Sequence, residues 1–420
     1  MSEVIELPAG LRLARYRIAF SPEARLVLPR NVGAMLRGGL GMALKRGTCA
    51  RPAGKLCGRC ELPDVCPYSF IFESPTPADT DVLRASSEIP PPYVLEPSLN
   101  QERVIEAGGR LEFGLVLFGQ AARYFPYALA ALRELGQQGL GPNAIRCRLA
   151  GADLLGLTGE ARSLYDDVAG RLLGSQPPAP SVTSWVGEIA APADRAGTAG
   201  PGDQSGIAST TVTLHFLTPT RLKHADRFVE GPPAFHVVIR ALLRRVSSLS
   251  YFYGGQRWEV DYRGWIERAE QVQIADAEVR WVDWERFSTR QQREMNLGGI
   301  VGRVTYAGDR GQEAGDRGQG TGVRGQGTGS RDQVSGSREQ GAEGQRNEGA
   351  GEQAASLPAL SAGSGPAYQC TNLPASQSTN LPISQLGAFL PLLRLGELVH
   401  VGKAAVFGNG RYELQIANGK

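Results

Sequence analysis

A short stretch near the C-terminal end of the chain combines an imidazole, two cations and several glycines. The set consists of His400, Gly402, Lys403, Gly408, Gly410 and Arg411. Glycines let a ligand approach the backbone closely, and the cations attract phosphate. The orders G-x-x-x-x-G-K-[ST] and strand-G-x-G-x-x-G-helix are absent, so nucleotide sites of those two types are not indicated. The stretch favours contact with a phosphate backbone, and an ordinary glycine-rich turn is the alternative.

A second cluster of reactive side chains lies nearer the N-terminus. Its four cysteines have the spacing C-x7-C-x2-C-x5-C and are Cys49, Cys57, Cys60 and Cys66. Four thiolates within one short loop can wrap a tetrahedral zinc ion, with the C-x2-C pair as the chelating unit. We therefore expect a structural zinc, while an iron–sulfur cluster or four metal-free thiols stay open. The other two cysteines stand alone in the sequence.

Composition sets the outer limits of the interpretation. The chain has 420 residues, 41% of them hydrophobic, and a net charge of +3. That length accommodates two domains with cores of their own, and the near-balanced charge means that any affinity for nucleic acid must come from local basic patches. Neither a signal peptide nor an apolar stretch long enough to cross a membrane is recognisable, so we expect a cytoplasmic protein without membrane contact. In that compartment the cysteines are expected as thiols or metal ligands and not as disulfides.

The first half of the chain shows a regular alternation of strands and helices that could position such residues. We expect elements at 11–20 (strand), 31–46 (helix), 93–95 (strand), 110–118 (strand), 121–137 (helix) and 145–149 (strand). Strand, helix, strand, strand, helix, strand is the ferredoxin-like βαββαβ order. A further helix is expected over 161–173, and residues 1–175 form the predicted N-terminal domain.

The same order recurs after a stretch rich in Pro, Ala, Gly and Ser at 176–206, which we interpret as a linker. The second series is 210–217 (strand), 235–249 (helix), 271–281 (strand), 300–306 (strand), a short helix near 389 and a strand from 412. The predicted fold is thus α+β, with two tandem ferredoxin-like domains at 1–175 and 207–420. The second is interrupted at 307–385, where RGQGTG and TNLP each occur twice. Such tandem repeats with few aromatics cannot bury a core, so a disordered insertion is expected there.

Five sequence motifs together resemble one protein family. They are LRGGLGMAL followed by the cysteine cluster, LVLFG from Leu115, FLTPTRLK from Phe216, WERFSTRQ from Trp284 with LGGIVG from Leu297, and HVGKAAVFGNGRY at the end. As a set they resemble the repeat-RNA-processing endoribonucleases of the RAMP superfamily of CRISPR-associated proteins. The likeness spans nearly the whole chain apart from the linker and the insertion.

This resemblance implies RNA cleavage without a metal or other cofactor. A base would take the proton of a ribose 2′-hydroxyl, whose oxygen then attacks the adjacent phosphate, leaving a 2′,3′-cyclic phosphate and a 5′-hydroxyl. Family members often hold the catalytic histidine in or near the first helix, and this chain has none there. We therefore expect His400 and Lys403 as the catalytic residues and place His224 second, because His215 falls on a strand and His236 opens a helix. A site that uses Tyr, Lys or Arg instead stays open.

The resemblance also indicates which residues contact RNA and which partners the protein has. The expected contacts are Gly402, Gly408, Gly410, Arg411, Arg221, Lys223, Arg286 and Arg290. For the arginines and lysine of the second domain, a solvated basic face is the alternative. CRISPR repeat RNA is the expected partner, and other effector subunits or a second copy of the chain are further ones. The alternative function is that of a RAMP subunit that holds guide RNA without cutting it.

Overall fold

The computed structural model describes residues 4–49, 57, 60, 65–74, 89–187, 210–283, 285–288, 293–296, 298–308, 367–369 and 386–418. Most of the predicted insertion, most of the cysteine loop and residues 188–206 of the predicted linker lie outside the described residues. No helix among the described residues is long and apolar enough to cross a membrane.

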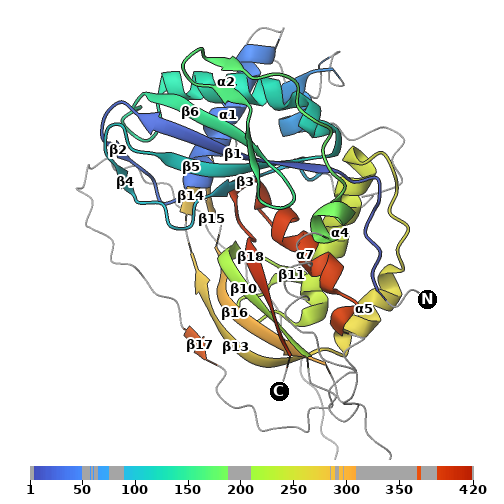
Figure 1. Cartoon of the computed structure of the whole chain (residues 1–420). Coiled ribbons are helices and arrows are strands. Elements are labelled where there is room, and N and C mark those ends of the chain that lie inside the picture. The colour runs from blue at the N-terminus through green and yellow to red at the C-terminus, as the bar shows by residue number, and fades with distance from the viewer. Residues whose placement is uncertain are drawn as a thin grey trace, which may run out of the picture. The chain divides into compact units, whose positions relative to one another are not determined.

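The N-terminal domain has the predicted βαββαβ order (Figure 1). Its elements are β1 (Leu13–Pro22), α1 (Val32–Thr48), β3 (Tyr93–Pro97), β5 (Leu111–Phe118), α2 (Phe125–Gln138) and β6 (Cys147–Leu155). The sheet runs β3-β5-β1-β6, extended by β7 (Ala161–Ser163), and every pairing in it is antiparallel. One face of this sheet and the helices α1 and α2 share a core that contains Tyr16, Leu36 and Leu132.

The C-terminal domain repeats this order and confirms the predicted fold class. Its elements are β10 (Thr210–Thr220), α4 (Phe235–Tyr253), β13 (Gln273–Val282), β16 (Gly299–Ala307), α7 (Leu390–Val399) and β18 (Tyr412–Asn418). The antiparallel sheet runs β13-β16-β10-β18, and β17 (Ala367–Gln369) pairs with the outer side of β13. The helix α5 (Tyr262–Glu270) was not predicted; the Asp261 side chain caps it by accepting from the Gly264 N–H.

The two domains share buried side chains. Val94, Val116 and Phe118 point away from α1 and α2 and belong to the same hydrophobic core as Leu242 of α4 and Leu398 of α7. The sheet of the N-terminal domain is therefore buried on both faces along β3 and β5. This arrangement places the end of β3 against the segment that follows α7.

Two segments behave differently from expectation. The helix predicted over 161–173 is wrong, since the chain forms β7, β8 (Tyr165–Asp166) and β9 (Arg171–Leu172). The Asp166 side chain accepts hydrogen bonds from the Val168 and Ala169 amides, which fixes a turn where a helix would continue. Of the predicted linker, residues 176–187 are described, and Val182 and Trp185 of this part are buried in the core.

Candidate RNA-binding and catalytic site

The glycine-rich loop between α7 and β18 folds back on itself and on the chain around β10. His400, Ala404, Gly408 and Gly410 have positive φ angles, so the backbone turns sharply several times. The Val401 N–H donates to the Gly410 carbonyl at 2.9 Å. The loop is thus a packed unit that includes the short helix η4 (Ala405–Phe407), and it is not an open cradle of amides.

His400 lies inside this packed unit. Its side chain is 0% exposed. Its Nδ1 lies 3.0 Å from the Asn409 carbonyl oxygen, and its Nε2 lies 3.5 Å from Oε1 of Glu96 on β3. Burial lowers the pKa of His400 below its usual value, although the Glu96 carboxylate opposes this effect. The prediction that His400 is catalytic does not fit this geometry, because a ribose cannot reach a fully buried ring.

Glu96 is the other half of this contact between the domains. Its side chain is 3% exposed and also lies 3.0 Å from the guanidinium of Arg15 on β1. Burial alone would raise the pKa of Glu96, but the nearby His400 ring and the charges of Arg15 and Arg411 outweigh it and lower the pKa to about 2. The buried carboxylate is therefore ionised at neutral pH and ties β1 and β3 to the glycine-rich loop.

The loop glycines serve close packing within the protein. A Cβ on Gly408 would lie 2.7 Å from Pro97 Cδ, and one on Gly410 would lie 1.9 Å from the Val401 carbonyl oxygen. The prediction that RNA approaches the backbone at these two glycines does not fit this geometry, because other atoms of the protein occupy the space beside them. Gly33 of α1 has the same character, because its Cβ would lie 1.9 Å from the Phe407 carbonyl oxygen. Small residues on both sides let α1 and the loop touch.

Several predicted cations do come together at the base of a small hairpin, formed by β11 (Lys223–His224) and β12 (Arg227–Phe228). The Lys403 N–H donates to the Arg221 carbonyl at 3.0 Å. The Arg221 guanidinium lies 3.8 Å from the centre of the Phe228 ring, and Lys403 Nζ lies 5.8 Å from it. Lys403 and Lys223 are exposed. The glycine-rich loop and the hairpin thus form one basic surface.

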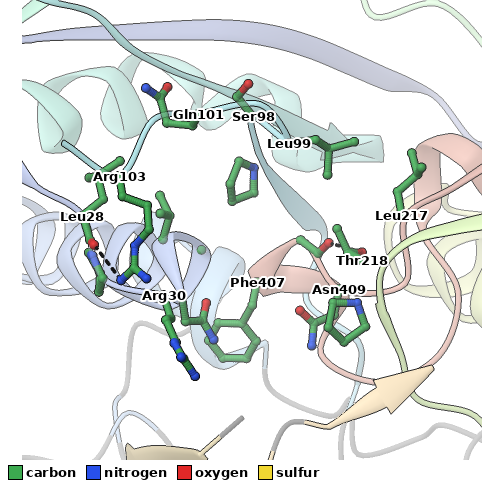
Figure 2. A pocket seen from close by; sticks show the side chains of 17 residues that line it. Leu28, Arg30, Ser98, Leu99, Gln101, Arg103, Leu217, Thr218, Phe407 and Asn409 are labelled. Carbon is green, nitrogen blue, oxygen red and sulfur yellow. Dashed lines mark hydrogen bonds between the residues drawn. The ribbon is translucent and has the colours of Figure 1, made fainter. Parts of the chain in front are cut away.

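A pocket of about 330 Å³ lies where α1 begins, next to the loop that follows β3 (Figure 2). Arg30 and Arg103 lie on one side of it, opposite Thr218 and Asn409. None of its lining residues is acidic. The pocket lies at the N-terminal end of α1, where the first backbone N–H groups of a helix face outward and attract anions. The Asn31 side chain accepts a hydrogen bond from one of them, the Ala34 N–H. The pocket therefore suits an anionic group such as a phosphodiester.

The remaining predicted contacts are distributed. Arg411 is half-buried and lines a second pocket with Arg15 and Arg17, near Glu96. Arg286 lies in β14 (Glu285–Ser288), whose side chains are not described, and Arg290 lies outside the described residues.

The loop that carries the four cysteines of the predicted zinc site is only partly described. Cys49, Cys57, Cys60 and Cys66 are half-buried thiols without disulfides, and the Cys60 N–H donates to the Cys57 carbonyl in the C-x2-C turn. Among the described residues, no three His, Cys, Asp or Glu side chains are grouped to hold a metal ion. Burial raises the pKa of the Cys57 thiol, although Lys45 opposes this rise. A structural zinc at this loop stays a prediction.

Sequence reasoning missed Glu96, Arg30 and Arg103. Glu96 has no distinguishing neighbour in the sequence, because its partners come from β1 and from a loop some 300 positions later. Arg30 had a usable signal, since it directly precedes the Asn31 cap at which an anion-attracting helix begins.

Comparison with known proteins gives two family matches. A model described as an N-terminal domain matches residues 11–177, and the model of the CRISPR-associated endoribonuclease Cas6 matches residues 214–321. No curated protein matches the chain.

The solved structures that resemble this chain include two structures of one Cas6 protein and one larger assembly. A Cas6 product complex is 14% identical, with 96% of this chain and 99% of that chain covered and a TM-score of 0.46. A Cas6 from Thermus thermophilus is 13% identical, with the same coverage and a TM-score of 0.44. A partial Cas6-RT-Cas1–Cas2 complex is 12% identical, with 99% and 47% covered and a TM-score of 0.44.

The match over residues 214–321 covers most of β10, the basic hairpin, α4, β13 and β16. It supports the interpretation of this chain as a CRISPR-associated repeat-RNA-processing protein of the RAMP type with endoribonuclease activity.

Proposed function

We propose that this protein cuts CRISPR repeat RNA by transesterification at a ribose 2′-hydroxyl and that no metal takes part. The observation that carries the proposal is the match of the Cas6 endoribonuclease model to the domain that bears the basic hairpin. The 2′-oxygen bonds to the adjacent phosphorus, the bond from phosphorus to the 5′-oxygen breaks, and the 2′-proton is transferred in effect to that 5′-oxygen. The products are a 2′,3′-cyclic phosphate and a 5′-hydroxyl, and no other reactant is consumed.

The RNA backbone would contact two basic surfaces of the described structure. One is the hairpin and loop surface with Arg221, Lys223 and Lys403, and the other is the pocket with Arg30 and Arg103. Lys403 remains the candidate for stabilising the charged phosphorane, because it is exposed and its ammonium group is free to move toward a phosphate. His400 instead holds the loop against β3.

The test uses the full-length protein and a synthetic RNA of its host's CRISPR repeat, in buffer with EDTA. We expect one cut, with product masses that correspond to a cyclic phosphate and a 5′-hydroxyl. A substrate with 2′-deoxyribose at the cut nucleotide should bind with unchanged affinity and stay intact, because it lacks the attacking oxygen.

Three outcomes would contradict the proposal. Cleavage of the deoxy substrate or a product with a 5′-phosphate would show a different reaction, and full loss of activity in EDTA that Mg²⁺ restores would show a metal-dependent one. Tight binding without any cleavage would instead support the alternative function, a RAMP subunit that holds RNA.

A further inference from the structure

The basic hairpin carries a histidine at a tightly constrained position. His224 ends β11, and Ala225 and Asp226 both have positive φ angles of 45° and 62°. Two consecutive residues of this kind form the tight turn that matches the twist of a hairpin, and glycine or asparagine is usual there. Residues other than glycine are strained at positive φ, and such backbone strain is concentrated at functional sites. The turn places His224 directly opposite Arg227.

A second histidine meets the first from another element. His236 lies in the first turn of α4, and its ring centre is 5.3 Å from that of His224, with the ring planes at 69°. His224 is exposed and His236 is half-buried, so solvent can reach this pair. His215, by contrast, stands on β10 opposite Arg303 of β16 and Glu413 of β18.

The charges around the two rings favour a phosphate. Arg240 lies one helical turn after His236 and therefore on the same side of α4. Neither Arg227 nor Arg240 forms an ion pair with another described residue. Glu270, at the end of α5, is the acidic group that acts on His236, and Asp226 pairs with Lys223 at 3.0 Å. The two imidazoles thus lie beside two uncompensated guanidinium groups.

We propose that His236 and His224 are the base and the acid of the RNA cleavage reaction, an inference that rests on the proposed function. A ring nitrogen of His236 takes the proton of the 2′-hydroxyl as the 2′-oxygen bonds to phosphorus. As the bond to the 5′-oxygen breaks, His224 gives its ring proton to that oxygen. The two rings then return to their starting states by proton exchange with water. Arg227 and Arg240 hold the phosphate oxygens.

The division of roles follows from the surroundings of the two rings. Burial lowers the pKa of His236, its neighbours His224 and Arg240 lower it further, and Glu270 opposes them. The start of a helix also disfavours a positive charge on His236. His236 is therefore neutral at neutral pH and can accept a proton. His224 is the exposed ring of the pair, and acid–base cleavage requires one group to accept a proton and the other to donate one.

The test measures single-turnover cleavage of repeat RNA by His224→Ala and His236→Ala, with His215→Ala as the matched control. Each variant of the pair should cut roughly 10²–10⁴-fold more slowly, and the control should cut at the wild-type rate. The RNA affinity of His236→Ala should change by less than about threefold, because a neutral imidazole adds little attraction for phosphate. The wild-type cleavage rate should show a bell-shaped dependence on pH. The rise of the rate at low pH should disappear in His236→Ala, and the fall of the rate at high pH should disappear in His224→Ala.

A modified substrate separates the two roles. RNA in which sulfur replaces the bridging 5′-oxygen at the cut site has a leaving group that needs no acid. It should restore cleavage by His224→Ala to near the wild-type rate and leave His236→Ala slow. If an alanine variant has a lower melting temperature than the wild type, His224→Gln and His236→Gln serve as second variants, because glutamine is close to histidine in size.

The outcomes distinguish this inference from the proposed function. The inference would be overturned, and the function left standing, if the wild-type protein cuts RNA to a cyclic phosphate and the alanine and glutamine variants of His224 and His236 all cut at the wild-type rate. Rescue of both histidine variants by the sulfur substrate would overturn the assignment of His236 as the base. Wild-type protein that never cuts would overturn the function and the inference together.

Discussion

The buried Glu96 carboxylate should contribute far more to stability than an exposed carboxylate in a similar ion pair. Its pKa falls from 4.5 to about 2 in the folded protein. A fall of that size corresponds to ~3 kcal/mol in the free energy of unfolding at pH 7. Glu96→Gln, which keeps the shape and removes the charge, should lower the free energy of unfolding by about that amount.

The matched control is Glu112→Gln on β5. Glu112 pairs with Arg110 at 2.6 Å, but the two side chains are 42% and 54% exposed. Exposed pairs contribute about 0–1 kcal/mol, because water and salt screen them. The assay is urea unfolding at pH 7, followed by tryptophan fluorescence and circular dichroism, with unchanged dependence on urea as the sign of an unaltered folded state.

The pH dependence gives a second readout. A lowered carboxyl pKa contributes stability that is fully present above pH 4.5 and is lost as the pH falls toward about 2. The difference between wild type and Glu96→Gln should therefore shrink over this window. The lowered pKa of His400 acts in the same direction, since stability from a neutral histidine is present above pH 6.5 and declines below it. If Glu96→Gln and Glu112→Gln differ by less than about 0.5 kcal/mol at pH 7, the reasoning is refuted.

Three more predictions follow from the close contact at α1, the arginine pocket and the cysteine loop. Gly33→Ala should destabilise the protein by roughly 1–3 kcal/mol, because its Cβ meets a loop carbonyl at 1.9 Å, whereas Gly38→Ala on the same helix should stabilise it by up to ~1 kcal/mol; equal melting temperatures would contradict this. Arg30→Ala and Arg103→Ala should each weaken RNA binding and make its logarithmic salt dependence shallower by about one, as fluorescence anisotropy at several salt concentrations would show; an unchanged slope would exclude phosphate contact. Protein prepared without chelators should contain zinc that Cys57→Ser loses, and elemental analysis that finds no metal in the wild type would end that prediction.

The sequence alone determined the fold, because the relevant signals are local. Alternating apolar residues at Tyr412, Leu414 and Ile416 indicate a strand, and the apolar face of α1 from Val32 to Leu44 indicates a helix despite its glycines. The order of these elements, repeated twice, was sufficient for two ferredoxin-like domains. The helix predicted over 161–173 was wrong because the Asp166 side chain accepts a hydrogen bond from the Val168 N–H and so favours a turn over a helix.

The tertiary structure decided which polar residues are available for chemistry. His400 is followed by glycines and cations in the sequence, a pattern that a phosphate-binding loop also shows. Only the tertiary structure reveals that β3 packs against this loop, so that His400 is buried beside Glu96. Conversely, His224 and His236 look unrelated until the hairpin turn and the start of α4 bring their rings to 5.3 Å. Burial and pairing of a side chain depend on elements distant in the chain, so spacing within one segment cannot reveal them.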